Sequence, residues 1–167
     1  SFAVHGITTG NPKIDINTMI GRKDKIVNQF TGGITQLFKA NKVASISGFA
    51  SVNANRVVSI KAQDGTISEI SGKHIILATG STPIELPFAK FDNKLILDNA
   101  GALDISAVPK RLGVIGAGVI GLELGSVWNR LGSDVVILEG LTEFLASADA
   151  DITKVAAREF KKQGLDI

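Results

Sequence analysis

Residues 111–139 read RLGVIGAGVIGLELGSVWNRLGSDVVILE, and this stretch decides the fold. Its first apolar run, Leu112–Ile115, is typical of a short buried parallel strand. The glycine-rich segment Gly116–Gly121 follows at once, and a second apolar run, Val135–Leu138, ends in Glu139. The apolar residues between the two runs recur at helical spacing: Ile120, Leu124, Val127 and Leu131. The stretch therefore predicts a β-α-β unit.

The glycines of this segment have the spacing GxGxxG, which is typical of dinucleotide-binding units. Gly116 allows a tight turn, and Gly118 lets the backbone approach a pyrophosphate without a Cβ in the way. Gly121 lets the helix pack closely on the strand, while the first N–H groups of the helix point at the phosphates. Strand, loop, helix, strand and terminal acid agree, so we predict dinucleotide binding. The alternative is a purely structural glycine turn.

Glu139 predicts which dinucleotide is bound. A carboxylate at this strand end accepts hydrogen bonds from the adenosine ribose hydroxyls and repels a 2′-phosphate. An NADP site usually places an arginine nearby, whereas the next basic residue after Glu139 is Lys154. The sequence therefore favours NAD, and the alternative is a solvated carboxylate.

The composition excludes several classes of protein. The net charge of +2 is small and its cations are dispersed, which argues against a nucleic-acid or anionic-membrane surface. No apolar run reaches the roughly twenty residues of a membrane span, and the N-terminus has no signal-like core. Cysteine is absent and the only histidines are His5 and His74, so we expect no metal site and assign neither histidine a catalytic role. With 167 residues and 44% hydrophobic content, we expect a soluble intracellular protein that fills one domain or parts of two.

Before the β-α-β stretch, the pattern predicts a long helix and then a small antiparallel meander. Helical spacing indicates a helix over residues 17–40, capped by Asp15 or Asn17. The pair Gly32-Gly33 inside it suggests a close approach or a kink. The dipeptide Asp64-Gly65 is typical of a hairpin turn. The predicted strands are Val43–Ile46, Phe49–Val52, Val57–Ala62, Ile67–Ile70 and His74–Ala78.

The last of these strands ends in the small residues Thr79, Gly80 and Ser81, and Pro83 then prevents regular structure from continuing. Small side chains at a strand end let a bulky ligand lie against the backbone, although by itself the pattern fits a plain loop. The segment Pro83–Pro109 has the pattern of a connector.

The chain resembles a known family over nearly its whole length. The motif ATGS at 78–81 is followed by VIGAGVIGLELGSVW at 114–128. Further matching segments are NQFTGGITQLFKANKV at 28–43, ISGFA at 46–50 and LEGLTEFLASADADI at 138–152. On these motifs the chain resembles the flavoprotein pyridine nucleotide-disulfide oxidoreductases, and within them the dihydrolipoamide dehydrogenase branch.

The resemblance implies an α/β fold with two dinucleotide-binding domains, of which this chain carries parts. Residues 1–109 would form the later part of an FAD-binding domain, with its β-meander and connector. Residues 110–167 would form the first part of an inserted, Rossmann-like NAD-binding domain. Residues 165–167 would enter a third strand of the NAD-domain sheet.

The resemblance also implies which residues contact cofactors. The FAD contacts would be Gly48, Ala50, Thr79, Gly80 and Ser81. Many relatives have glycine at the position of Ala50. A contact between FAD and the main chain would survive that change. The NAD contacts would be Gly116, Ala117, Gly118, Val119, Ile120 and Gly121 at the pyrophosphate, and Glu139 at the ribose. Glu123 matches an acid on the nicotinamide side, and its alternative role is an acid favoured by the positive end of a helix.

Several elements of the family have no counterpart in residues 1–167. These are an earlier GxGxxG unit for FAD, a CxxxxC redox disulfide, an FAD-contacting Asp, and a C-terminal dimer domain with a catalytic His–Glu pair. We therefore expect no catalytic residue in this chain and no enzymatic activity from residues 1–167 alone. In the complete enzyme, the resemblance implies that dihydrolipoamide reduces the disulfide, electrons pass to FAD, and hydride passes to NAD.

The implied partner is the lipoyl domain of a 2-oxoacid dehydrogenase or glycine cleavage complex. The implied assembly is a homodimer, in the cytoplasm or, in a eukaryote, in the mitochondrial matrix. Two alternatives stay open. A sister reductase of the glutathione, mercuric or transhydrogenase type would be favoured by a basic pair after the second strand, and none is present. A non-catalytic nucleotide-binding module would fit the lack of cysteine.

Overall fold

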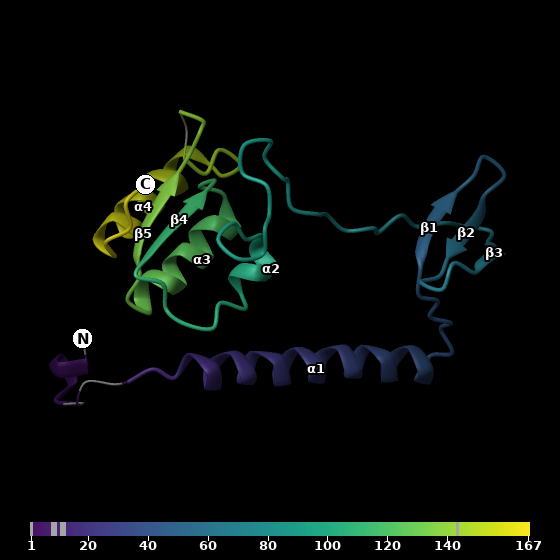
Figure 1. The fold of residues 1–167 in the computed structure, drawn as a ribbon, viewed down its shortest axis with the longest axis horizontal. Coiled ribbons are helices and arrows are strands. Elements are labelled where there is room, and N and C mark those ends of the chain that lie inside the picture. The colour runs from purple at the N-terminus through teal and green to yellow at the C-terminus, as the bar shows by residue number, and fades with distance from the viewer. Residues whose placement is uncertain (1, 8–9, 11–12, 143) are drawn as a thin grey trace. The chain divides into compact units, whose positions relative to one another are not determined.

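The structure is a computed structural model that describes residues 2–7, 10, 13–142 and 144–167. The chain divides into two compact units, one formed by Ser1–Lys25 with Pro83–Ile167 and the other by Ile26–Thr82. A short 3-10 helix, η1 (Phe2–His5), comes first, and the unit boundary falls inside the long helix α1 (Ile16–Ala40). Figure 1 shows the order of the elements along the chain.

The long helix α1 confirms the predicted helix, with its start one residue earlier. Asp15 caps it, because the carboxylate accepts the Thr18 N–H at 3.1 Å and the Thr18 hydroxyl at 2.9 Å. The close approach predicted at Gly32-Gly33 is not found among the described residues, since a Cβ added at either glycine meets nothing within 4 Å. The helix runs through both glycines without interruption.

The unit Ile26–Thr82 contains the predicted meander. Strands β1 (Phe49–Val52), β2 (Val57–Lys61) and β3 (Ile67–Ser71) pair antiparallel in the order β1-β2-β3. At the β2–β3 turn, the Asp64 carboxylate accepts the Thr66 N–H at 2.9 Å and Gly65 has φ +87°. The predicted hairpin is therefore confirmed, because Asp64-Gly65 supplies both the side-chain acceptor and the positive φ.

Two predicted strands, Val43–Ile46 and His74–Ala78, do not form. Ile76 is 90% exposed and Leu77 is 74% exposed, so these apolar side chains face solvent. A strand needs a partner strand for its backbone N–H and C=O groups, and no strand among the described residues pairs with either segment. Apolar β-branched composition alone was therefore not sufficient to form these strands.

The other unit contains the predicted β-α-β unit. Strands β4 (Arg111–Ile115) and β5 (Asp134–Leu138) pair in parallel, joined by α3 (Val119–Arg130). After β5 and helix α4 (Ala150–Lys162), Asp166 pairs in parallel with Val136, and its carbonyl accepts the Ile137 N–H at 2.7 Å. Among the described residues the predicted third strand is represented only by this isolated bridge beside β5, and β4 and β5 form a two-stranded sheet.

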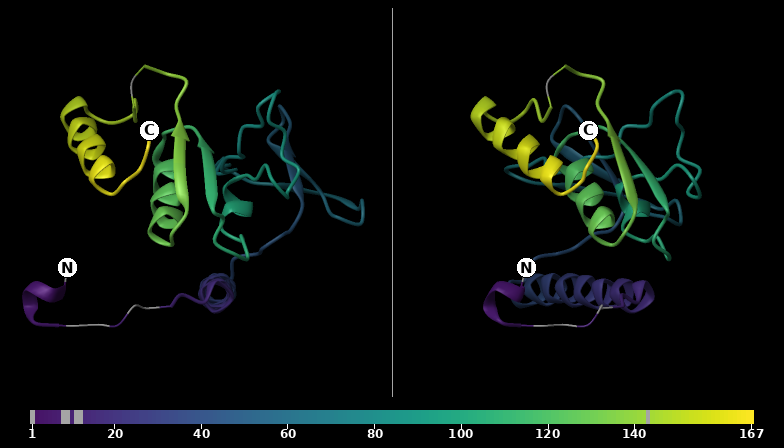
Figure 2. Two further views of the ribbon diagram at one scale, coloured as in Figure 1. Left: turned by 60° about the vertical axis from the view of Figure 1, so that its left-hand side comes forward. Right: turned by 90° about the vertical axis from the view of Figure 1, so that its left-hand side faces the viewer.

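Helices α3 and α4 cover one face of this sheet (Figure 2). Parallel crossovers that advance in one direction are right-handed and place their helices on the same face. The contact is direct, because the Ser126 hydroxyl of α3 donates to the Gln163 side-chain oxygen after α4 at 3.3 Å. A Cβ on Gly125 would lie 3.1 Å from Ile137 Cδ1, so this glycine lets α3 sit close to β5.

The core of this unit lies between α3 and the sheet. Its buried members are Ile16, Ala117, Leu122, Trp128, Val135, Ile137 and Leu165. The Trp128 indole N–H donates to the Ala102 carbonyl at 3.1 Å, which ties α3 to the short helix α2 (Asn99–Ala102) in the predicted connector. The opposite face of the sheet leaves Ile115 and Leu138 more than half exposed.

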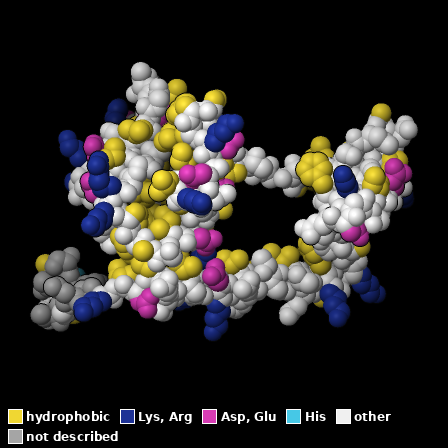
Figure 3. All heavy atoms as spheres, viewed as in Figure 1, with side chains coloured by type: hydrophobic (Ala, Val, Ile, Leu, Met, Phe, Trp, Pro, Cys, Tyr) yellow, Lys and Arg dark blue, Asp and Glu magenta, His cyan; other side chains and the backbone are white. Residues whose placement is uncertain are grey.

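Apolar side chains are also exposed along α1, including Phe30 at 70% and Leu37 at 61%, and Figure 3 shows apolar surface over both units. Among the described residues, no helix combines the length and the hydropathy that a membrane crossing requires.

Candidate functional site

The glycine loop, residues 116–118, lies between the carboxyl end of β4 and the first turn of α3. Gly116 has φ +103°, a conformation that side chains disfavour, and its N–H donates to the Leu138 carbonyl at 2.7 Å. Gly118 is the residue before the first turn of α3 and has no side chain with which to bond the helix N–H groups. The positive end of α3 is therefore not covered by a capping side chain, as an anion site requires.

Glycine is needed at the second and third positions of the motif for different reasons. A Cβ built on Gly121 would collide with the Gly116 carbonyl oxygen and lie 3.1 Å from Val114 Cγ1. A Cβ built on Gly118 would meet nothing within 4 Å. Gly121 thus permits helix and strand to pack, while Gly118 keeps open the space in front of the helix end, where a pyrophosphate fits.

The other predicted residues of this segment divide between core and surface. The Ala117 side chain is completely buried, and its N–H donates to Glu139 Oε2 at 2.8 Å. Val119 and Ile120 are 55% and 59% exposed at the start of α3. The Ala117 side chain therefore lies in the core and its N–H bonds Glu139 after β5, whereas the side chains of Val119 and Ile120 are accessible.

Glu139 follows β5 and accepts two backbone hydrogen bonds. Its Oε1 accepts the Leu141 N–H at 2.9 Å, and its Oε2 accepts the Ala117 N–H. Donation by Leu141, then by Ala117 and Gly140, lowers the pKa of the Glu139 carboxyl below its ordinary value of 4.5. The group is ionised at neutral pH, and each carboxylate oxygen retains acceptor capacity for a ligand hydroxyl.

The sequence pattern missed both contacts of Glu139, the Ala117 N–H and the Leu141 N–H. Any residue except proline offers a backbone N–H, so the residue type at 141 carries no signal for it. Glu123 lies exposed in α3, on the second turn from the glycine loop. Among the described residues it forms no salt bridge.

The five predicted FAD contacts all lie in the unit Ile26–Thr82. A Cβ on Gly48 would lie 2.7 Å from both Ile60 Cγ2 and the Lys61 carbonyl oxygen, so the meander itself requires glycine there. Ala50 is exposed in β1. The residues Thr79, Gly80 and Ser81 form an exposed loop in which Gly80 has φ +72°.

No backbone hydrogen bond among the described residues joins this exposed loop to β1. The structure therefore does not link the two groups of predicted FAD residues to each other by main-chain bonds. The described residues also contain no cluster of three or more His, Asp or Glu side chains that could hold a metal ion.

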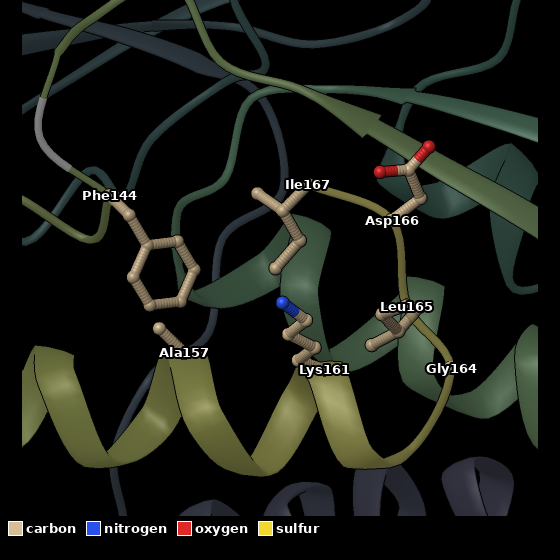
Figure 4. A pocket seen from close by; sticks show the side chains of 7 residues that line it. All are labelled: Phe144, Ala157, Lys161, Gly164, Leu165, Asp166 and Ile167. Atoms are coloured by element: carbon tan, nitrogen blue, oxygen red, sulfur yellow. The ribbon is translucent and has the colours of Figure 1, made fainter.

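A cavity of about 510 Å³ lies elsewhere (Figure 4). Its lining residues come from α4 and the chain after it, together with Phe144, and include no residue of the glycine loop. They are Phe144, Ala157, Lys161, Gly164, Leu165, Asp166 and Ile167. The open helix end, the glycine geometry and the anchored carboxylate instead identify the glycine loop as the candidate site.

Comparisons with known proteins find similar chains. The family described as pyridine nucleotide-disulphide oxidoreductase matches residues 4–167. The chain is 50% identical to a dihydrolipoyl dehydrogenase of Cupriavidus necator over 161 residues, which are 96% of this chain and 34% of that protein. It is 45% identical to the mitochondrial dihydrolipoyl dehydrogenase of Pisum sativum, over 99% of this chain and 33% of the relative.

A solved structure is also similar. The crystal structure of LpdA from Mycobacterium tuberculosis matches with a TM-score of 0.81 and 27% identity, over 94% of this chain and 36% of that chain. The chain thus spans about a third of the length of the curated relatives named above.

Proposed function

This chain belongs to the pyridine nucleotide-disulphide oxidoreductase family, and from that premise we propose that the whole protein is a dihydrolipoamide dehydrogenase. It would oxidise protein-bound dihydrolipoamide and reduce NAD by way of FAD and a redox disulfide. The chain has no cysteine, so that disulfide would lie outside residues 1–167. The geometric observation that carries the proposal is the glycine loop, where Gly118 leaves the end of α3 open to a pyrophosphate.

We propose that the two parts of the chain bind different cofactors. Residues 1–109 would belong to the FAD-binding domain and its connector, and residues 110–167 would begin the NAD-binding domain. NAD fits the glycine loop because a phosphate needs N–H donors and close backbone approach, which the α3 end and Gly118 supply. FAD would lie against the backbone at Gly48, Ala50 and Thr79–Ser81.

When bound, FAD and NAD would supply the two-electron transfer, and the residues of this chain would bind and orient them. The glycine loop would fix the NAD diphosphate, and Glu139 would accept a hydrogen bond from the adenosine ribose. Glu123, exposed beyond the loop on α3, would lie on the nicotinamide side. None of these residues gives or takes a proton in the reaction that we propose.

The proposed partner is the lipoyl domain of a 2-oxoacid dehydrogenase or glycine cleavage complex, and the proposed assembly is a homodimer. The proposed location is the cytoplasm, or the mitochondrial matrix in a eukaryote. The mitochondrial name of the Pisum sativum relative and the bacterial source of the Cupriavidus necator relative support these two locations.

An assay of the full-length protein tests the proposed function. With FAD bound, the protein is expected to reduce NAD in the presence of dihydrolipoamide, and residues 1–167 alone are expected to show no turnover, because they contain no cysteine. NADH formation is followed by absorbance. A full-length protein that reduces oxidised glutathione or another disulfide but does not oxidise dihydrolipoamide would contradict the substrate assignment.

The position of Glu139 predicts selectivity for NAD over NADP. A 2′-phosphate would meet an anionic carboxylate whose lowered pKa keeps it charged, and the nearest following cation in the sequence is Lys154. We expect kcat/KM to favour NAD by about 2 kcal/mol, roughly thirtyfold, the scale of one unsatisfied charged contact. Steady-state kinetics with both cofactors measure this ratio, and equal values would contradict the ribose role of Glu139.

A further inference from the structure

The Glu139 carboxylate joins the two loops that follow β4 and β5. One oxygen accepts the Ala117 N–H at 2.8 Å, across 22 residues of sequence, and the other accepts the Leu141 N–H at 2.9 Å. Because both donors are backbone groups of loops, one side chain fixes the separation of the two loops. Charge-assisted bonds of this kind are about twice as strong as neutral ones.

The glycine loop needs such an anchor more than an ordinary turn does. Gly116 and Gly118 flank Ala117, and glycine loses more backbone freedom on ordering than any other residue. The buried methyl group of Ala117 fixes one side of this peptide, and the bond from its N–H to Glu139 fixes the other. The orientation of the two glycines around Ala117, and with it the approach to the α3 end, depends on this pair of contacts.

We propose that Glu139 is a positioning residue that fixes the glycine loop in the geometry that receives the pyrophosphate. This role rests on the proposed NAD binding and is separate from any contact with the ribose. A loop that adopts the competent geometry only part of the time reduces apparent affinity by that fraction. Loss of the Glu139 anchor therefore weakens binding even of ligands that have no ribose hydroxyl to offer.

The test compares two competitors of NADH in the full-length protein, ADP and 2′,3′-dideoxy-ADP. In Glu139→Ala, the inhibition constant of dideoxy-ADP is expected to rise by about tenfold, the scale of one charge-assisted hydrogen bond. Glu139→Gln retains an amide oxygen that can accept one of the two N–H groups, so it is expected to restore part of the loss. Hydrogen exchange at the Ala117 amide, measured without nucleotide, is expected to accelerate at least tenfold in Glu139→Ala.

The matched control is Asp134→Ala, which removes one carboxylate from the opposite end of the same strand, β5. Asp134 is exposed, and among the described residues its carboxylate has one ion-pair partner, Arg111, whose Nε lies 3.8 Å away. It is expected to leave both inhibition constants and the Ala117 exchange rate within twofold of the unaltered protein. Retained flavin absorbance shows that the FAD-binding part is intact, and unchanged circular dichroism and thermal unfolding show that the NAD-binding part of each variant is folded.

The outcomes separate this inference from the function on which it rests. If Glu139→Ala weakens ADP but not dideoxy-ADP, and Ala117 exchange is unchanged, Glu139 acts through the ribose alone and the inference is overturned. If neither competitor displaces NADH from the unaltered protein, the proposed nucleotide site is wrong. In that case, faster exchange at Ala117 would still support the anchoring of the loop by Glu139.

Discussion

Replacing Gly118 with valine in the full-length protein is expected to weaken NAD binding severely while the fold remains intact. Gly118 has φ −79° and ψ 177°, an extended conformation that valine adopts readily, and an added Cβ meets nothing within 4 Å. The branched side chain would instead fill the space before the α3 end. We expect the dissociation constant for NADH to rise by about a hundredfold or more, since about 2.7 kcal/mol of phosphate contacts would be lost.

NADH titration and thermal unfolding together measure this prediction. Gly118→Ala, which adds only the Cβ, serves as the graded control and is expected to lose less affinity than the valine variant. Flavin absorbance is expected to be the same in both variants. Unchanged NADH affinity in folded Gly118→Val would show that the glycine loop does not bind the pyrophosphate.

Replacing Gly121 with alanine is expected to have the opposite profile, with a large loss of stability. The new Cβ would collide with the Gly116 carbonyl oxygen, a backbone atom that cannot move without shifting the turn after β4. It would also press on Val114, whose Cγ1 would be 3.1 Å away. Overpacking of a core typically costs about 1–3 kcal/mol of stability. Because the atom in the way here belongs to the backbone, we expect Gly121→Ala to cost about 3 kcal/mol or more.

Urea or thermal unfolding of the full-length protein measures the effect, and Gly118→Ala is the matched control because it adds the same single carbon three residues earlier. That control is expected to change the free energy of unfolding by less than about 0.5 kcal/mol. A Gly121→Ala protein as stable as the control would contradict the packing role of the third glycine.

The sequence by itself determined the parts of this protein whose signals are local. The GxGxxG spacing between two apolar runs was sufficient for β4, α3 and β5, because the positive φ of Gly116 and the close packing at Gly121 are both local to the β-α-β unit. Apolar residues at helical spacing likewise predicted α1 to within one residue. Asp64-Gly65 predicted the hairpin because its side-chain acceptor and positive φ act within the turn.

Only the tertiary structure decided which segments found partners. The runs Val43–Ile46 and His74–Ala78 have strand composition but no partner among the described residues, because pairing depends on a second segment that composition does not name. The same holds at the site. The sequence placed a carboxylate at Glu139, but only the folded chain brings the Ala117 N–H, 22 residues earlier, within 2.8 Å of it. Contacts of this range depend on the parallel pairing of β4 with β5, which places the loops after the two strands side by side.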